Sequence, residues 1–165
     1  MGKADAAAGA IIFAKQSKRF LLVKCSNKVT EPGKWGLVGG HIESGETPEQ
    51  ALLREMQEEV KLTFSGKLHP LYVFEPNKHD NSAKYTTFLA MIEMEFTPVL
   101  NDEHTEFLWV KSLHRDNLPV RHYLHPRLAA LLDNPSVIAK IQQLTGTGKV
   151  EASTKERIRY YLENR

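Results

Sequence analysis

The sequence has little cysteine, no long apolar run and no excess of one charge, and each shortage excludes a class of protein. Cys25 is the only cysteine, so the chain can form neither an internal disulfide nor a structural zinc site built from cysteines. No stretch approaches the roughly 18 apolar residues of a membrane-spanning helix, and the first ten residues lack the apolar core of a signal peptide. We therefore expect a cytoplasmic protein in a reducing compartment, with no membrane partner.

The charge of the chain also points to no macromolecular partner. It carries 22 basic and 20 acidic residues, a formal net charge of +2, which is far from the basic excess of a nucleic-acid-binding surface. We therefore expect no nucleic acid partner. A length of 165 residues, 41% of them hydrophobic, fits one globular domain with a single sizeable core.

Short apolar segments separated by polar turns predict an α/β domain. Residues 10–13 and 20–24 read as a hairpin, residues 35–38 as a brief strand, residues 71–74 and 84–94 as a second antiparallel pair, and residues 107–110 as a last strand. Residues 126–132 and 135–144 have helical spacing. Ser153 and Glu156 have the spacing of a capping box before a terminal apolar stripe, which we expect to pack on the domain, a dimer contact being the alternative.

The most informative stretch is residues 40–62, GHIESGETPEQALLREMQEEVKL. Thr47 can cap a helix, Pro48 suits the first helical position, and Gln50 completes a capping box, so we predict a helix over residues 48–60. On that helix Glu58 and Glu59 would lie about 60° and about 40° to either side of Glu55, so the three carboxylates share one face.

The apolar residues of the same helix lie apart from this acidic face, which can therefore point toward a cleft. Acidic helix faces are most often plain solvated surface. Here, however, Gly39, Gly40 and Gly45 precede the helix and permit tight turns, through which a backbone carbonyl could add a further oxygen ligand. Clustered oxygen ligands suit Mg²⁺ or Mn²⁺, whose charge offsets both the carboxylates and a substrate's phosphates.

This stretch resembles the Nudix box, in which Gly is followed after five residues by Glu, after seven more by Arg-Glu, and then by an apolar residue and a Glu pair. The matching residues are Gly40, Glu46, Arg54, Glu55, Met56, Glu58, Glu59 and Leu62. The pattern departs at Lys61, where the family usually has Gly, and this puts the end of the helix in doubt. Either Lys incurs a steric penalty in a left-handed turn, or the chain leaves the helix in another conformation.

The resemblance implies a Nudix α/β/α sandwich with a mixed central sheet, in which the box forms a loop, a helix and a second loop. We assign residues 1–134 to a Nudix hydrolase domain and residues 135–165 to a helical extension packed on the same domain. The reaction implied is metal-dependent attack of water on a phosphorus of a nucleoside diphosphate derivative, such as a nucleoside triphosphate, a sugar nucleotide or a dinucleotide. The cofactor implied is Mg²⁺ or Mn²⁺.

The resemblance also implies roles for residues of the box. Glu55, Glu58 and Glu59 would be metal ligands, helped by the carbonyl of Gly39. Three further residues would support these ligands: Gly40 as part of the loop before the helix, Arg54 by orienting a ligand carboxylate, and Glu46 by bracing the loop.

The general base is left open between the box helix and a later loop. Glu59 is the first candidate, with Glu58 beside it in the catalytic set. Relatives often carry an additional acid before the last short strand, which makes Glu103 the second candidate, ahead of Glu106. His104 reads as a turn residue.

The sequence gives much less information about the residues that contact the substrate than about the metal ligands. Our candidates are Trp35, which could stack on a base, His41 beside the glycine loop, and Arg121, which could reach a phosphate. Aromatic residues in strands are more often core, and the same applies to Tyr85. Nothing in the sequence selects among nucleotide substrates or settles whether the protein is a homodimer.

Two alternative functions belong to other classes. An isoprenyl diphosphate isomerase of this fold would need a reactive cysteine in its site, whereas Cys25 lies at a predicted strand end. A non-catalytic sensor of nucleotide derivatives often loses box carboxylates, and this chain retains all three.

Overall fold

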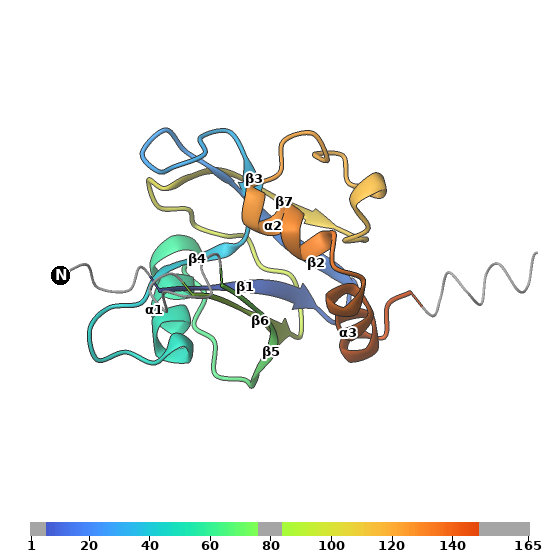
Figure 1. The fold of residues 1–165 in the computed structure, drawn as a ribbon, viewed down its shortest axis with the longest axis horizontal. Coiled ribbons are helices and arrows are strands. Elements are labelled where there is room, and N and C mark those ends of the chain that lie inside the picture. The colour runs from blue at the N-terminus through green and yellow to red at the C-terminus, as the bar shows by residue number, and fades with distance from the viewer. Residues whose placement is uncertain (1–5, 76–83, 149–165) are drawn as a thin grey trace, which may run out of the picture.

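The computed structural model describes residues 6–75 and 84–148. The described strands are β1 (Ala7–Ala14), β2 (Arg19–Cys25), β3 (Trp35–Gly36), β4 (Val38–His41), β5 (Leu68–Phe74), β6 (Tyr85–Ile92) and β7 (His104–Val110). The helices of the same residues are α1 (Pro48–Val60), α2 (Pro126–Leu132) and α3 (Pro135–Thr145), with a short 3-10 helix at Arg115–Asn117 (Figure 1). None of these helices is both long enough and apolar enough to span a bilayer.

The described strands form one mixed sheet that forks at β1. One edge of β1 pairs in parallel with β6, which pairs antiparallel with β5. The other edge is shared, because β4 pairs with the first half of β1, up to Ala10↔Val38, and β2 pairs with the second half, from Ile12↔Leu21 onward. β2 also pairs with β3 and β7. The sheet therefore opens between β4 and the group formed by β2, β3 and β7.

Alternate residues of β1 point to opposite faces of the sheet and into two separate cores. Ile11 and Phe13 belong to the first core, which α2 and α3 cover with Leu128, Leu131, Val137 and Ile141. Ala10 and Ile12 belong to the second core, which α1 covers with Leu52, Met56 and Val60. Helices thus lie on both faces of a mixed sheet (Figure 1), and the predicted α/β/α sandwich is confirmed.

The helix α1 has the bounds and the N-terminal cap that the sequence predicts. The hydroxyl of Thr47 accepts a hydrogen bond from the Gln50 N–H at 3.1 Å, and the Gln50 side chain accepts one from the Thr47 N–H at 2.9 Å. At the other end Lys61 adopts the left-handed conformation, with φ 59° and ψ 35°. The chain therefore keeps the turn that Gly makes in the family and accepts the steric penalty of a side chain there.

Several strand predictions differ from the structure. Strands β1 and β5 begin at Ala7 and Leu68 rather than at residues 10 and 71. The single strand expected at residues 35–38 is divided, because Trp35 and Gly36 pair with β2 whereas the residues from Val38 onward pair with β1. The last strand begins at His104 rather than at residue 107, because its polar first residues pair with β2 as far as Cys25. Pairing with a neighbouring strand thus overrides local polarity.

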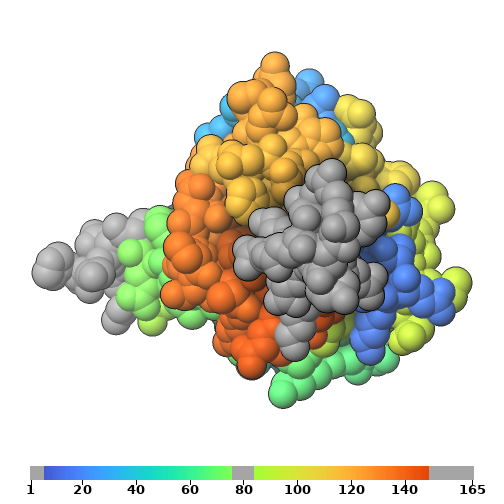
Figure 2. Space-filling view, turned by 90° about the vertical axis from the view of Figure 1, so that its right-hand side faces the viewer, coloured from blue at the N-terminus to red at the C-terminus, as the bar shows by residue number. Residues whose placement is uncertain are grey.

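The C-terminal part of the described chain packs on the same domain. Val137 and Ile141 of α3 lie in the first core. Figure 2 looks onto this side of the molecule, where the orange to red surface of α2 and α3 and the blue surface of the β1–β2 turn are both exposed. The predicted helix that begins near Ser153 lies outside the described residues, so the extension over residues 135–165 stays a prediction as a whole.

Candidate active site

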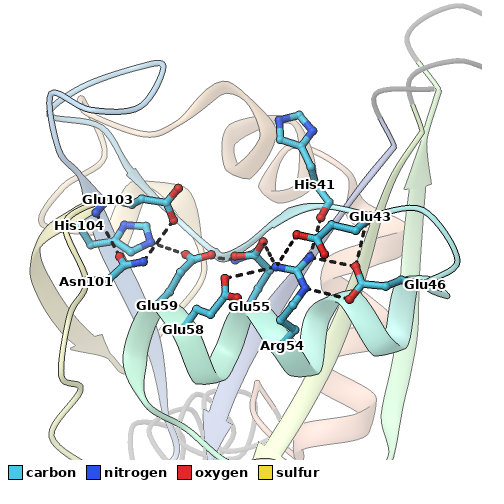
Figure 3. Close-up of polar contacts among 11 residues, drawn as sticks. His41, Glu43, Glu46, Arg54, Glu55, Glu58, Glu59, Asn101, Glu103 and His104 are labelled. Carbon is cyan, nitrogen blue, oxygen red and sulfur yellow. Dashed lines mark hydrogen bonds and ion pairs between the residues drawn. The ribbon is translucent and has the colours of Figure 1, made fainter. Parts of the chain in front are cut away.

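Three carboxylates meet at one point of the structure. Oxygen atoms of Glu55, Glu59 and Glu103 all lie within 4.8 Å of one another. Glu55 and Glu59 come from successive turns of α1 and are buried, whereas Glu103 comes from the turn before β7 (Figure 3). The cluster therefore joins two segments that are far apart in the sequence.

Hydrogen bonds of the turn before β7 hold Glu103 against the end of α1. The Asn101 N–H donates to the Glu59 carbonyl at 3.2 Å, and the Glu103 N–H donates to the Asn101 side-chain oxygen at 3.1 Å. The Glu103 carbonyl in turn accepts from the Ser26 N–H at 2.8 Å, just beyond β2. Glu106 instead pairs with Lys24 at 2.8 Å and does not belong to the cluster.

Glu59 is an unusual buried acid. One of its oxygens contacts the Nε2 atom of His104 and, more weakly, the Gly39 N–H at 3.5 Å. The other, Oε2, is buried and has no hydrogen-bond partner within residues 6–75 and 84–148. Burial, and then the neighbouring Glu55 carboxylate, raise the pKa of Glu59 far above its usual range. An ionised Glu59 therefore requires a compensating positive charge.

Arg54 connects the acidic face of α1 to the loop that precedes the helix. Its guanidinium donates to both oxygens of Glu46 at 2.8 Å and 2.9 Å, and also to the His41 carbonyl at 3.0 Å. Further bonds reach Glu55 at 3.0 Å and Glu58 at 3.2 Å (Figure 3). Hydrogen bonding to Arg54 lowers the pKa of Glu46 to about 2, so this acid stays ionised at neutral pH.

Two glycines allow β4 to approach both β1 and α1 closely. A Cβ atom on Gly40 would lie 2.5 Å from a carboxylate oxygen of Glu55, and one on Gly39 would lie 2.1 Å from the Ala8 carbonyl oxygen. Any larger residue at position 40 would displace the Glu55 carboxylate. These contacts give a physical reason for the glycine pair that the sequence shows.

A cavity of about 350 Å³ extends from the carboxylates into the fork of the sheet. One wall consists of β4 and the acidic cluster, including Gly39, His41, Glu59 and Glu103. A second wall consists of Tyr85 at the start of β6 and of His125 and Arg127 at the start of α2. The volume is within the range of small-molecule sites in proteins.

The structure brings some predicted site residues together and leaves others apart. Of the three predicted substrate contacts, His41 lines the cavity, whereas Trp35 is buried in the first core and neither it nor Arg121 lines the cavity. The Glu58 side chain is 54% exposed, bonds to Arg54 and is not one of the three clustered acids. Its role as a ligand and as a catalytic residue stays a prediction, as does that of the Gly39 carbonyl.

Sequence reasoning did not assign several residues of the cavity to the site, among them His104, His125, Arg127 and Cys25. The two histidines and Arg127 lie outside the box, and no local pattern connects them to it. Cys25 lies in the cavity after all, because β2 ends there. Burial, and then the Glu59 carboxylate, raise the pKa of its thiol, which therefore stays protonated and poorly nucleophilic at neutral pH.

The donor set of the cluster fits a divalent cation with a preference for oxygen. It offers carboxylate oxygens only, one of which is the buried and unpartnered Oε2 of Glu59. Without a cation, the close approach of the carboxylates in a buried place costs free energy, as the raised pKa of Glu59 indicates. These are the ligands that Mg²⁺ and Mn²⁺ favour.

Comparison with known proteins agrees with this geometry. The family described as NUDIX domain matches residues 3–128. The dihydroneopterin triphosphate diphosphatase of Haemophilus influenzae is 33% identical over 118 residues, which are 62% of this chain and 71% of the relative. The nucleoside triphosphatase NudI of Salmonella arizonae is 32% identical over 132 residues, which are 68% of this chain and 89% of the relative.

Solved structures show the same fold. The dihydroneopterin triphosphate pyrophosphohydrolase of E. coli superposes with a TM-score of 0.58 at 24% identity, over 88% of this chain and 97% of that one. The Nudix hydrolase RenU of M. smegmatis superposes with a TM-score of 0.63 at 25% identity, over 90% of this chain and 89% of that one. The family match, the relatives and the box on α1 together assign the chain to the Nudix family, as a Nudix pyrophosphohydrolase.

Proposed function

We propose that this protein is a cytoplasmic, metal-dependent enzyme that hydrolyses a diphosphate linkage in a small-molecule triphosphate of the nucleoside type. The observation that carries this proposal is the cluster of Glu55, Glu59 and Glu103 at the end of a cavity of small-molecule size. The names of two relatives, one for dihydroneopterin triphosphate and one for nucleoside triphosphates, support a triphosphate among the nucleotide derivatives.

The cation would be held by Glu55, Glu59 and Glu103, with Glu58 and the Gly39 carbonyl as additional ligands. Mg²⁺ or Mn²⁺ at this place would supply charge neutralisation and Lewis acidity toward phosphate oxygens. Arg54 orients the Glu55 carboxylate through its bond at 3.0 Å and is itself fixed by both oxygens of Glu46. The acidic wall is thereby held in place before a substrate arrives.

The attacking water needs a carboxylate that takes its proton, and two of the clustered acids are suitable. Glu59 is the first candidate, because its Oε2 atom has no partner in the described parts of the chain. Glu103 is the second, because it lines the cavity on a turn that Asn101 and Ser26 hold in place. The ion pair between Glu106 and Lys24 supports ranking Glu106 behind Glu103.

The test is a substrate panel with purified protein, in Mg²⁺ or Mn²⁺ and again with excess EDTA. The panel contains dihydroneopterin triphosphate, the four common nucleoside triphosphates, a sugar nucleotide and a dinucleoside polyphosphate, with products separated by ion-exchange chromatography. We expect turnover of a triphosphate that disappears in EDTA. Turnover that persists in EDTA would refute the metal dependence, and turnover of the sugar nucleotide alone would refute the substrate class.

Variants of single glutamates connect activity to the cluster. Glu59→Gln and Glu103→Gln should each lower turnover, the first by at least about 100-fold, because each removes a charged group from the proposed metal site. Glu49→Gln is the matched control, since Glu49 is an exposed residue on the first turn of the same helix. A control that lost as much activity as Glu59→Gln would show that the effect does not come from the cluster.

A non-catalytic sensor is the remaining alternative. It predicts that the protein binds one of these compounds, as a thermal shift would report, and releases no product in either metal. The isomerase alternative has no support in the relatives above, and the protonated Cys25 thiol speaks against it.

A further inference from the structure

One feature of the second wall of the cavity suggests how the substrate is held. Arg127 lies over the ring of Tyr85, with its guanidinium carbon 4.4 Å from the ring centroid. Both side chains line the cavity that also contains Glu59 and Glu103. Such a stack holds a guanidinium in place through the face of the group and leaves its N–H donors available.

The ring of Tyr85 is held in place because Gly9 of β1 has no side chain and lets the ring pack closely. A Cβ atom on Gly9 would lie 1.9 Å from the Tyr85 hydroxyl oxygen, so the ring packs against the backbone of β1. Tyr85 is also fixed at the start of β6 by its pairing with Ala7 on one side and with Phe74 on the other. The ring over which the exposed Arg127 lies is therefore fixed by the sheet.

The charge of Arg127 is not compensated within the described residues. Two Lys or Arg side chains line the cavity, and the other one, Lys28, pairs with Asp102 at 3.0 Å. Arg127 forms no ion pair with any acid of residues 6–75 and 84–148, although acids occupy the same cavity. An unpaired guanidinium beside a cavity is a strong site for an anion with planar or tetrahedral oxygens.

His125 adds a second donor next to Arg127. Its Nδ1 atom accepts a hydrogen bond from the Arg127 backbone N–H at 3.1 Å, and burial, followed by the charge of Arg127, lowers the pKa of the imidazole. The neutral ring therefore carries its proton on Nε2. Both residues line the cavity and carry N–H donors, and neither carries a negative charge.

We propose that Arg127, positioned by the ring of Tyr85 and assisted by His125, binds a phosphate group of the substrate at the wall formed by α2. This inference rests on the proposed function and deepens it, because it makes the phosphate chain rather than the base the part of the substrate that the second wall recognises. Tyr85 is in this view a positioning residue, since it acts through Arg127.

Steady-state kinetics with the four nucleoside triphosphates test the proposal. Arg127→Gln should raise KM by about 10–100-fold for each of the four nucleoside triphosphates, because this is the loss of affinity expected when a hydrogen bond to a charged group is removed. The same variant should change kcat by less than about threefold. Tyr85→Leu should follow Arg127→Gln in raising KM, whereas Tyr85→Phe, which keeps the ring, should behave like the parent. Lys140→Gln, which removes one positive charge from an exposed position of α3, is the matched control and should leave KM unchanged.

Three results would overturn the proposal. The first is a KM that does not change in Arg127→Gln, and the second is a change that depends on the base, which would assign Arg127 to base recognition. The third is an equal rise of KM in the control Lys140→Gln, since Lys140 is exposed on α3 and does not line the cavity. Thermal unfolding of each variant identifies any loss of folding, and Arg127→Lys, which keeps the charge but not the fork of donors, should give an intermediate KM.

Binding of inorganic tripolyphosphate in Mg²⁺, measured by calorimetry, separates this inference from the proposed function. Tripolyphosphate has no base, so its affinity should fall about tenfold or more in Arg127→Gln. If the parent hydrolysed no nucleotide but this loss of affinity appeared, the proposed function would fail and the inference would stand. If the parent hydrolysed triphosphates and neither KM nor tripolyphosphate affinity depended on Arg127, the inference alone would fail.

Discussion

The substitution Lys61→Gly should stabilise the protein, because it restores glycine to the left-handed turn after α1. Lys61 has φ 59° and ψ 35°, and its N–H bonds to the Gln57 carbonyl at 3.2 Å. A side chain in this conformation destabilises the folded state by about 1–2 kcal/mol, and glycine would remove this strain. Glycine also increases the entropy of the unfolded chain, which offsets about 0.5–1 kcal/mol of the gain. We expect a net gain of about 0.5–1 kcal/mol in the free energy of unfolding.

Urea denaturation followed by circular dichroism measures this difference directly, and a gain of this size corresponds to a rise in Tm of about 1–4 °C for a domain of this length. Among the described residues, the side chain of Lys61 makes one long hydrogen bond, 3.4 Å from its Nζ to the Glu58 carbonyl. Lys61→Ala removes that bond and keeps the strain, so it isolates the backbone effect. It should not stabilise the protein.

A second control is Lys67→Gly, at an exposed position whose φ is not positive. Glycine there adds only unfolded-state entropy, so this variant should lose about 0.4–1 kcal/mol. The reasoning is refuted if Lys61→Gly lowers the urea midpoint as Lys67→Gly does, because the left-handed turn would then carry no strain.

Three further outcomes follow from the box. Glu58→Gln should lower turnover by at least about 100-fold with an unchanged Tm, and near-normal activity in Mg²⁺ would show that Glu58 is not a ligand. Gly40→Ala should raise the Mg²⁺ concentration needed for half-maximal activity, because its methyl group would meet the Glu55 carboxylate at 2.5 Å; an unchanged Mg²⁺ titration would contradict this. Glu46, whose pKa is lowered by Arg54 from 4.5 to about 2, contributes stability that is present above about pH 4.5 and lost as the pH falls through about 2. Glu46→Gln should therefore show a smaller fall of Tm over this range than the parent, and equal slopes would rule out the contribution of the pair.

Local sequence signals were sufficient for α1 and its surroundings. The cap at Thr47, the proline at position 48 and the spacing of the acids act within a few residues, and the structure has the predicted helix bounds and capping bonds. At Lys61 the same pattern identified the departure but left open which conformation follows the helix, and the structure shows the left-handed turn. Predictions of this kind succeed because a helix end is determined by hydrogen bonds among adjacent residues.

The second wall of the cavity could not be predicted in the same way. Arg127 and Tyr85 are 42 positions apart in sequence, and only the placing of α2 above the start of β6 brings them together. Trp35 is the opposite case, since an aromatic residue beside the glycine loop is a reasonable stacking candidate, whereas its side chain is buried in the first core and its role as a substrate contact stays a prediction. Which face of a strand a residue occupies depends on pairing partners that no local pattern shows.

The fork of the sheet has a mechanical consequence. Glu55 and Glu59 belong to α1, which packs on β4, whereas Glu103 is anchored beside the end of β2. A cation shared by these acids would cross-link the two branches of the sheet, β4 with α1 on one side and the group formed by β2, β3 and β7 on the other. Loading the cation would then raise the unfolding temperature, by an amount that grows with the logarithm of the ion concentration divided by its dissociation constant.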